Sequence, residues 1–122
     1  MTEALRRARH LSGLAAEERA ARLLERLGFA ILARRARTPA GEIDLVARTA
    51  SLLVFCEVKL RATREGAAHA VLPRQRRRIA AAAEAFLAAH PELCGLDMRF
   101  DAVLIGRDGG LDHLPGAFEA DG

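Results

Sequence analysis

Two stretches of the sequence that are otherwise apolar carry charged residues. Asp44 lies in the stretch Ile43–Arg48, and Glu57 and Lys59 lie in Leu52–Leu60. Burying a charge without a partner costs several kcal/mol, so these positions need either solvent or a counter-ion. Alternate residues of a strand share a face, and we therefore expect Glu57 and Lys59 to point the same way.

The short loop around residues 49–51 predicts that these two stretches form an antiparallel hairpin. With an even number of residues in the loop, Asp44 comes opposite or diagonal to Glu57, and two carboxylates and an ammonium converge on one patch of sheet. Carboxylate oxygens suit Mg²⁺, with Mn²⁺ as an alternative, because Mg²⁺ is held by one or two carboxylates, waters and substrate phosphate. Such an ion lowers the pKa of a bound water and stabilises charge on a phosphate, while Lys59 orients or activates the nucleophile.

The same spacing also fits an ion pair between Lys59 and a carboxylate on a solvent-facing strand. One compositional observation favours a special role for this lysine. Of the 19 basic residues 18 are arginines, and Lys59 is the only lysine. A position that keeps lysine in such a background indicates a need for a compact ammonium, which a guanidinium cannot replace.

The elements that must position these residues follow from periodicity and from breaker residues. Ser12 and Gly28 bound a helix with an apolar stripe, and Glu17 lies on the flank of that helix. Pro73 opens a second helix that ends at His90, before Pro91. The remaining segments are expected to be strands or turns: a strand over Phe29–Arg34, a turn over 38–41, a strand over Met98–Ile105, a turn over 108–110 and a short strand over Leu111–Leu114. This order, αβββαβ with a further short strand, predicts an α/β fold with a mixed sheet flanked by helices.

The segments Gly41–Arg48 and Leu53–Arg61, which read GEIDLVAR and LVFCEVKLR, resemble the core of the PD-(D/E)xK nucleases. More narrowly, the chain is similar to the YraN-like uncharacterised protein family, which is related by fold to archaeal Holliday-junction resolvases. The resemblance extends over about residues 12–118 and implies a restriction-endonuclease-like fold. It also implies that Asp44 and Glu57 are metal ligands, that Lys59 is the catalytic lysine, and that Glu17 is an auxiliary carboxylate.

Four arginines crowd the start of the second helix, at Arg74, Arg76, Arg77 and Arg78. The helix dipole disfavours cations there by about 0.3 to 1 kcal/mol each, which phosphate neutralisation would offset. With Arg61 and Arg64 they are expected to form a strip that binds a nucleic-acid backbone. A solvated charged face is the alternative for this run.

Two other acidic residues were considered for the site. Glu42 shares a strand face with Asp44, but we expect it to be a strand-entry residue satisfied by backbone or an arginine. Asp101 interrupts a strand, and a structural hydrogen bond is the preferred interpretation over a site role.

At 122 residues the chain fits one domain over 12–118, with residues 1–11 as an N-terminal arm and 119–122 as a tail. Its two cysteines show neither zinc spacing nor disulfide density, and it has no apolar stretch long enough to span a membrane, which together with the absence of a signal-peptide pattern predicts a cytoplasmic protein. The formal charge of +3 leans toward a polyanionic partner.

Three hypotheses follow from the sequence. The first is a Mg²⁺-dependent endonuclease that hydrolyses phosphodiesters in branched or structured nucleic acid, DNA rather than RNA. The second is a non-catalytic nucleic-acid-binding module that keeps the nuclease fold, and the third is an interaction protein whose charged cluster is structural. Two-fold substrates such as four-way junctions would favour a homodimer.

Overall fold

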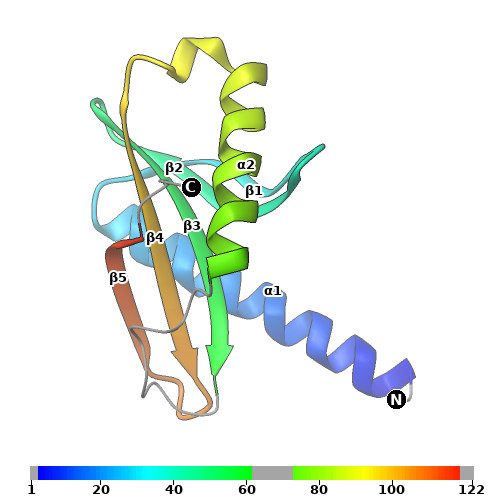
Figure 1. Cartoon of the computed structure of the whole chain (residues 1–122). Helices are drawn as coiled ribbons and strands as arrows, with labels where there is room; N and C mark the ends of the chain where they lie inside the picture. Colours follow the sequence, from blue (N-terminus) through cyan, green and yellow to red (C-terminus); the bar gives the residue numbers. More distant parts are fainter. Residues whose placement is uncertain (1–2, 62–72, 119–122) are drawn as a thin grey trace.

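The computed structural model describes residues 3–61 and 73–118, which form a five-stranded mixed sheet with one helix packed on each face (Figure 1). The elements in chain order are α1 (Glu3–Arg26), β1 (Ala30–Thr38), β2 (Gly41–Arg48), β3 (Leu52–Arg61), α2 (Pro73–Ala89), a 3₁₀ turn η2 (Pro91–Leu93), β4 (Asp97–Gly106) and β5 (Leu111–Phe118). The order αβββαββ and the α/β class agree with the sequence prediction.

The first helix is longer than predicted, since it begins at Glu3 and not at Ser12. Residues 3–10 are mostly alanine, leucine, arginine and glutamate, which favour helix, and Ser12 and Gly13 together cost only about 1 to 2 kcal/mol in a helix interior. The N-terminal end of α1 extends beyond the sheet (Figure 1).

The end of α1 was predicted correctly at Gly28. This glycine has a φ of 96°, a left-handed conformation that side chains with a Cβ rarely adopt. The Phe29 N–H donates to the Leu24 carbonyl and the Gly28 N–H to the Glu25 carbonyl, both at 3.0 Å. This pair of bonds satisfies carbonyls that the helix end would otherwise leave open, so the chain turns directly into β1.

Alternation along the strands divides the core into two layers. Leu53 and Phe55 of β3 pack with α2, whereas Val54 and Cys56 pack with α1. Period-2 alternation with both faces apolar is what a sheet covered on each side requires. Of the described helices, none is both long and apolar enough to cross a membrane.

Strands β2 and β3 diverge part of the way along their length. They pair antiparallel from Arg48↔Leu53 to Leu45↔Cys56, and their ladder ends there. Beyond that point β2 continues to pair with β1 as far as Gly41, while β3 continues parallel to β4 (Figure 1). The next positions in the β2–β3 register are Asp44 and Glu57, so both predicted site carboxylates lie at the fork between the two strands.

Candidate active site

Asp44 takes over the hydrogen bonding of the sheet at the fork. Its Oδ2 accepts a hydrogen bond from the Val58 N–H at 2.8 Å, in the place where a carbonyl of β2 would serve if the ladder continued. Burial and the neighbouring Glu57 carboxylate raise the pKa of Asp44 to about 7, against the lowering effect of the Val58 hydrogen bond. Glu17 raises this pKa further and Lys59 lowers it, so the three other predicted residues each interact electrostatically with Asp44.

Glu57 is one of two buried charged residues in the described part of the chain, with 5% of its surface exposed. Its Oε1 lies 3.2 Å from Nζ of Lys59 and 3.6 Å from a terminal nitrogen of Arg78, on α2. Its Oε2 is also buried and has no hydrogen-bond partner among the described residues. A buried carboxylate oxygen without a partner is costly, and it marks a place where a ligand or ion would be stabilising.

Glu17 of α1 reaches the fork from the other face of the sheet. Its Oε2 accepts a hydrogen bond from Nε of Arg35 at 2.8 Å, and its side chain is 16% exposed. The helix periodicity places Glu17 on a flank of α1, and from there its side chain reaches Arg35 of β1. Its pairing with Arg35 was not predicted, because nothing local distinguishes this arginine from the others in the run 34–37.

The donor set at the fork fits a hydrated cation better than a fully protein-bound one. Within residues 3–61 and 73–118 there is no group of three or more histidine, cysteine, aspartate or glutamate side chains placed to hold a metal. Asp44 and Glu57 are therefore the two carboxylates on offer, with the free Oε2 of Glu57 as the open position. Mg²⁺ accepts such a set, because it retains several waters and takes further ligands from substrate phosphate.

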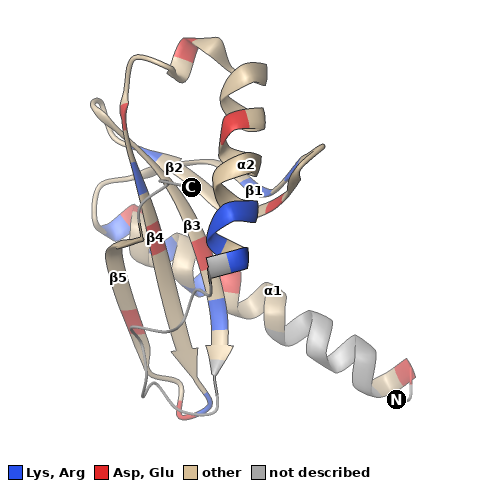
Figure 2. Cartoon of the chain, viewed as in Figure 1, with Lys and Arg blue, Asp and Glu red and all other residues tan. Residues whose placement is uncertain are grey.

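The predicted basic strip is described only in part. The first turns of α2 carry arginines next to the end of β3 (Figure 2), where Arg78 contacts Glu57 and Arg74 and Arg77 are exposed. Arg64 and the side chain of Arg61 lie outside the described part of the structure. Within the described part of the strip, Arg78 is seen in contact with a predicted site carboxylate, Glu57.

Asp101 and Glu42 have the structural roles that were preferred for them. Asp101 is fully buried and accepts hydrogen bonds from Arg99, at 2.7 and 2.9 Å, and from the Gly116 N–H, at 3.0 Å. His113 Nε2 lies 2.8 Å from the Asp101 Oδ2, the oxygen that also accepts the 2.9 Å hydrogen bond from Arg99. Glu42 is half exposed and pairs with Arg37 at 3.6 Å.

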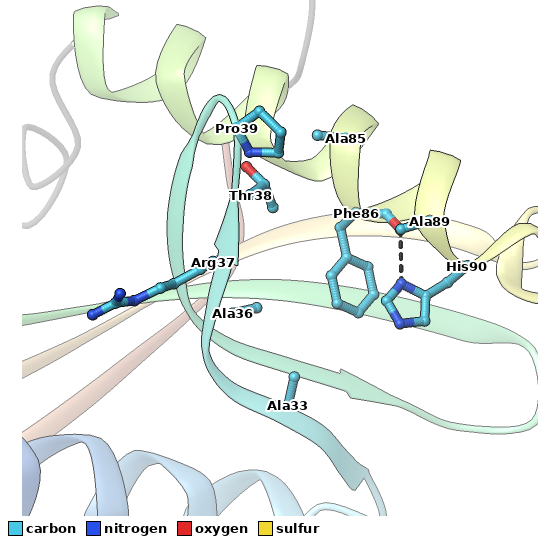
Figure 3. Close-up of a pocket in the computed structure, with 9 residues that line it drawn as sticks. All are labelled: Ala33, Ala36, Arg37, Thr38, Pro39, Ala85, Phe86, Ala89 and His90. Atoms are coloured by element: carbon cyan, nitrogen blue, oxygen red, sulfur yellow. Dashed lines mark hydrogen bonds between the residues drawn. The ribbon is translucent and has the colours of Figure 1, made fainter.

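A pocket of about 290 Å³ lies between the β1–β2 hairpin and the C-terminal half of α2 (Figure 3). The rings of Phe86 and His90 stack inside it with centroids 4.1 Å apart, and the Arg37 side chain points away from it. Its nine lining residues are Ala33, Ala36, Arg37, Thr38, Pro39, Ala85, Phe86, Ala89 and His90. None of the predicted site residues is among them, so the pocket and the fork are separate features.

A five-stranded mixed sheet between two helices, with Asp44 at a strand fork and Glu57 and Lys59 two residues apart on the next strand, defines a protein of the restriction-endonuclease-like fold class. Comparison with known families then assigns the family. Residues 16–105 match the Uncharacterised protein family UPF0102, and the chain belongs to that family, which is the YraN-like family.

Relatives from three bacteria cover most of the chain. A UPF0102 protein of Azorhizobium caulinodans is 65% identical over 117 residues, which are 96% of this chain and 89% of the relative. A UPF0102 protein of Rhodopseudomonas palustris is 55% identical over 109 residues, or 89% and 84% of the two chains. One of Bradyrhizobium sp. is 53% identical over 109 residues, or 89% and 77%.

Proposed function

We propose that this protein is a Mg²⁺-dependent endonuclease that hydrolyses phosphodiester bonds in structured nucleic acid, DNA rather than RNA. The observation that carries the proposal is the pair of carboxylates at the fork. Burial, together with the charge of the neighbouring Glu57, raises the pKa of Asp44 to about 7, and one buried oxygen of Glu57 has no partner among the described residues. A pair arranged in this way is destabilising by itself and becomes favourable when a divalent cation binds.

Asp44 and Glu57 would hold the ion, which supplies Lewis-acid stabilisation of phosphate charge and a water of lowered pKa. Lys59 contributes a mostly buried ammonium 3.2 Å from Glu57, placed to orient the nucleophile or to stabilise negative charge in the transition state. Arg78 and the other arginines of α2 offer positive charge next to the carboxylates, where the backbone of a nucleic acid needs it.

A non-catalytic nucleic-acid-binding module is the second candidate, and one observation favours it. Glu57 already contacts two cations, Lys59 and Arg78, so much of the charge at the fork is balanced within the protein. In that case the arginines bind the phosphate backbone and the carboxylates only organise the cations.

A cleavage screen separates the two candidates. Purified protein is incubated with labelled single-stranded, duplex, flap and four-way-junction DNA, and with matched RNA, in Mg²⁺ or Mn²⁺. The nuclease proposal expects product with at least one substrate and loss of product in Lys59→Ala. Binding without product under any of these conditions, with Lys59→Ala indistinguishable from wild type, would favour the binding module.

A further inference from the structure

Arg35 has the only positive φ among the non-glycine residues that the structure describes, at 50°. It lies on β1 opposite Asp44 of β2, between two regular pairs of the β1–β2 ladder. A long side chain in this left-handed region costs about 1 to 3 kcal/mol, and such residues persist where the surroundings enforce them, which is common at functional sites. The non-glycine residue with a positive φ in the described part of the chain therefore lies at the candidate site.

Glu17 is the one described residue that is hydrogen-bonded to the side chain of Arg35. The Arg35 Nε donates to Glu17 at 2.8 Å, and the carboxylates of Glu17, Glu42 and Asp44 together raise the pKa of Arg35. A guanidinium carries five N–H donors in one plane, and the contact with Glu17 uses the donor at Nε. No hydrogen bond joins its terminal nitrogens to any other described residue, so they stay available for a second acceptor.

A structural role in joining α1 to β1 does not explain the unusual backbone of Arg35, because the neighbouring Arg34–Glu18 pair already joins these two elements. Arg34 contacts Glu18 at 3.3 and 3.4 Å with both partners about half exposed, and its backbone is regular. Arg35 and Glu17 are less exposed and lie beside Asp44. The two pairs thus join the same two elements, but only one of them belongs to the fork.

We propose that Arg35 binds a phosphate of the bound nucleic acid, on the side of Asp44 opposite Lys59, and that Glu17 is the positioning residue that orients its guanidinium. In the strand order β1-β2-β3, Arg35 on β1 and Lys59 on β3 belong to the two strands on either side of the strand that carries Asp44, so positive charge lies on both sides of Asp44 along the sheet. The planar guanidinium group can donate two parallel hydrogen bonds to two phosphate oxygens, and a lysine ammonium at this position could not. This inference rests on the proposed function, because it assumes that nucleic acid lies over the fork.

The test measures binding separately from cleavage. A fluorescent four-way DNA junction is titrated with protein over a series of salt concentrations, with Ca²⁺ in place of Mg²⁺ to suppress cleavage. The key variant is Arg35→Asn, since asparagine tolerates a positive φ while it removes the cation and its contact with Glu17. Arg34→Asn is the matched control on the same strand. Arg35→Lys keeps the positive charge but lacks the planar guanidinium group. Glu17→Gln keeps Arg35 but weakens the contact that orients it.

We expect Arg35→Asn to weaken binding about tenfold and to reduce the slope of log affinity against log salt by about 0.9, with little effect of Arg34→Asn. Arg35→Lys and Glu17→Gln should retain the slope and lose part of the affinity. Thermal unfolding of each variant establishes that it folds. Equal effects of Arg34→Asn and Arg35→Asn, or no effect of Arg35→Asn, would overturn the inference, as would failure of the wild type to bind.

Cleavage in Mg²⁺, followed in parallel, decides the proposed function. Wild type that binds through Arg35 but releases no product leaves the phosphate contact standing and removes the nuclease activity. Wild type that cleaves, with Arg35→Asn unchanged in affinity and salt slope, leaves the nuclease standing and removes the phosphate contact.

Discussion

The carboxyl group of Asp44 is under two opposing influences. Burial and the charge of Glu57 favour its protonated form, while the hydrogen bond from the Val58 N–H favours the carboxylate. The first two are stronger, and the pKa rises to about 7. At neutral pH, Asp44 in the metal-free protein is therefore close to half protonated.

This pKa shift predicts how stability depends on pH without metal. The folded pKa lies above the unfolded value, so the native state binds the proton more tightly, and stability falls as pH rises from about 4 through 7. Asp44→Asn removes this loss and can still accept the Val58 hydrogen bond. At pH 8 in EDTA we expect the variant to be more stable than wild type by on the order of 2 to 4 kcal/mol, with a smaller difference at pH 5.

Urea unfolding at the two pH values measures the effect. Glu42→Gln is the matched control, because Glu42 lies two residues away on β2 but is half exposed and paired with Arg37. If Asp44→Asn were destabilised at both pH values to the same extent, burial and the Glu57 charge would not be the dominant effects on Asp44.

Among the elements, α2 brings positive charge to the fork through its first turns. Arg78 contacts Glu57 directly, and its aliphatic chain also lies against Gly41 at the tip of the β1–β2 hairpin. A Cβ added at Gly41 would come within 3.3 Å of the Arg78 Cγ, so the hairpin approaches α2 closely at a residue with a φ of 143°. Arg78 therefore contacts both the β1–β2 hairpin and Glu57 of β3.

Removing the arginine cluster tests whether α2 is a phosphate-binding element. Changing Arg76, Arg77 and Arg78 to alanine together is expected to weaken nucleic-acid binding and to flatten its salt dependence by up to about 0.9 for each lost duplex contact. Fluorescence anisotropy across a salt series measures both quantities. The control removes three exposed arginines elsewhere on the chain: Arg22, Arg26 and Arg107. Similar slopes for the two triple variants would mean that α2 has no special role in binding.

One buried carboxylate adds side-chain bonds to the backbone ladder that joins β5 to β4 at the edge of the sheet. Asp101 of β4 accepts hydrogen bonds from Gly116 of β5 and from Arg99, and it contacts His113 of β5. Burial raises the pKa of Asp101, but these hydrogen bonds lower it by more, so the pKa lies below its usual value. The β4–β5 register shifts between Phe100 and Ala102, and Asp101 lies at this irregularity, where its side chain replaces ladder bonds.

The lowered pKa predicts acid sensitivity through Asp101. Its stabilisation is fully present above the unfolded pKa of about 3.9 and is lost as pH falls through the lower folded value. Asp101→Asn is expected to cost about 3 kcal/mol at pH 7 and less at pH 3, as measured by chemical unfolding. Asp97→Asn, at the exposed start of the same strand, is the control and should cost little. The same cost for Asp101→Asn at both pH values would contradict this account.

At the scale of the whole molecule, the two helices cover opposite faces of a sheet that divides between β2 and β3. Each helix sends one charged side chain to the division, Glu17 from α1 and Arg78 from α2. A cation bound there would link β2 and β3 beyond the end of their ladder, where the charged side chains of both helices also reach the sheet. Metal binding should therefore be visible in global stability.

We expect Mg²⁺ to raise the melting temperature of the wild type by mass action, by the equivalent of about 2.7 kcal/mol at a concentration roughly 100 times Kd. Asp44→Asn and Glu57→Gln should respond little and cleave nothing. Lys59→Ala should keep the Mg²⁺ response while it loses turnover, because its proposed role lies in the transition state. Differential scanning fluorimetry with Ca²⁺-free buffers measures the shift, and an equal response in all four proteins would place the ion elsewhere.

The sequence by itself determined the order of elements, the two apolar layers and the identity of the charged residues at the fork. These follow from local rules: alternation sorts Leu53 and Phe55 from Val54 and Cys56, and breaker residues such as Pro73 mark the element ends. Only the tertiary structure decided that β2 and β3 separate at Asp44, that Glu17 takes Arg35 as its partner, and that Arg35 has a positive φ. Strand divergence and the choice of one ion pair among 18 arginines depend on contacts between residues distant in the chain, and no local periodicity carries that information.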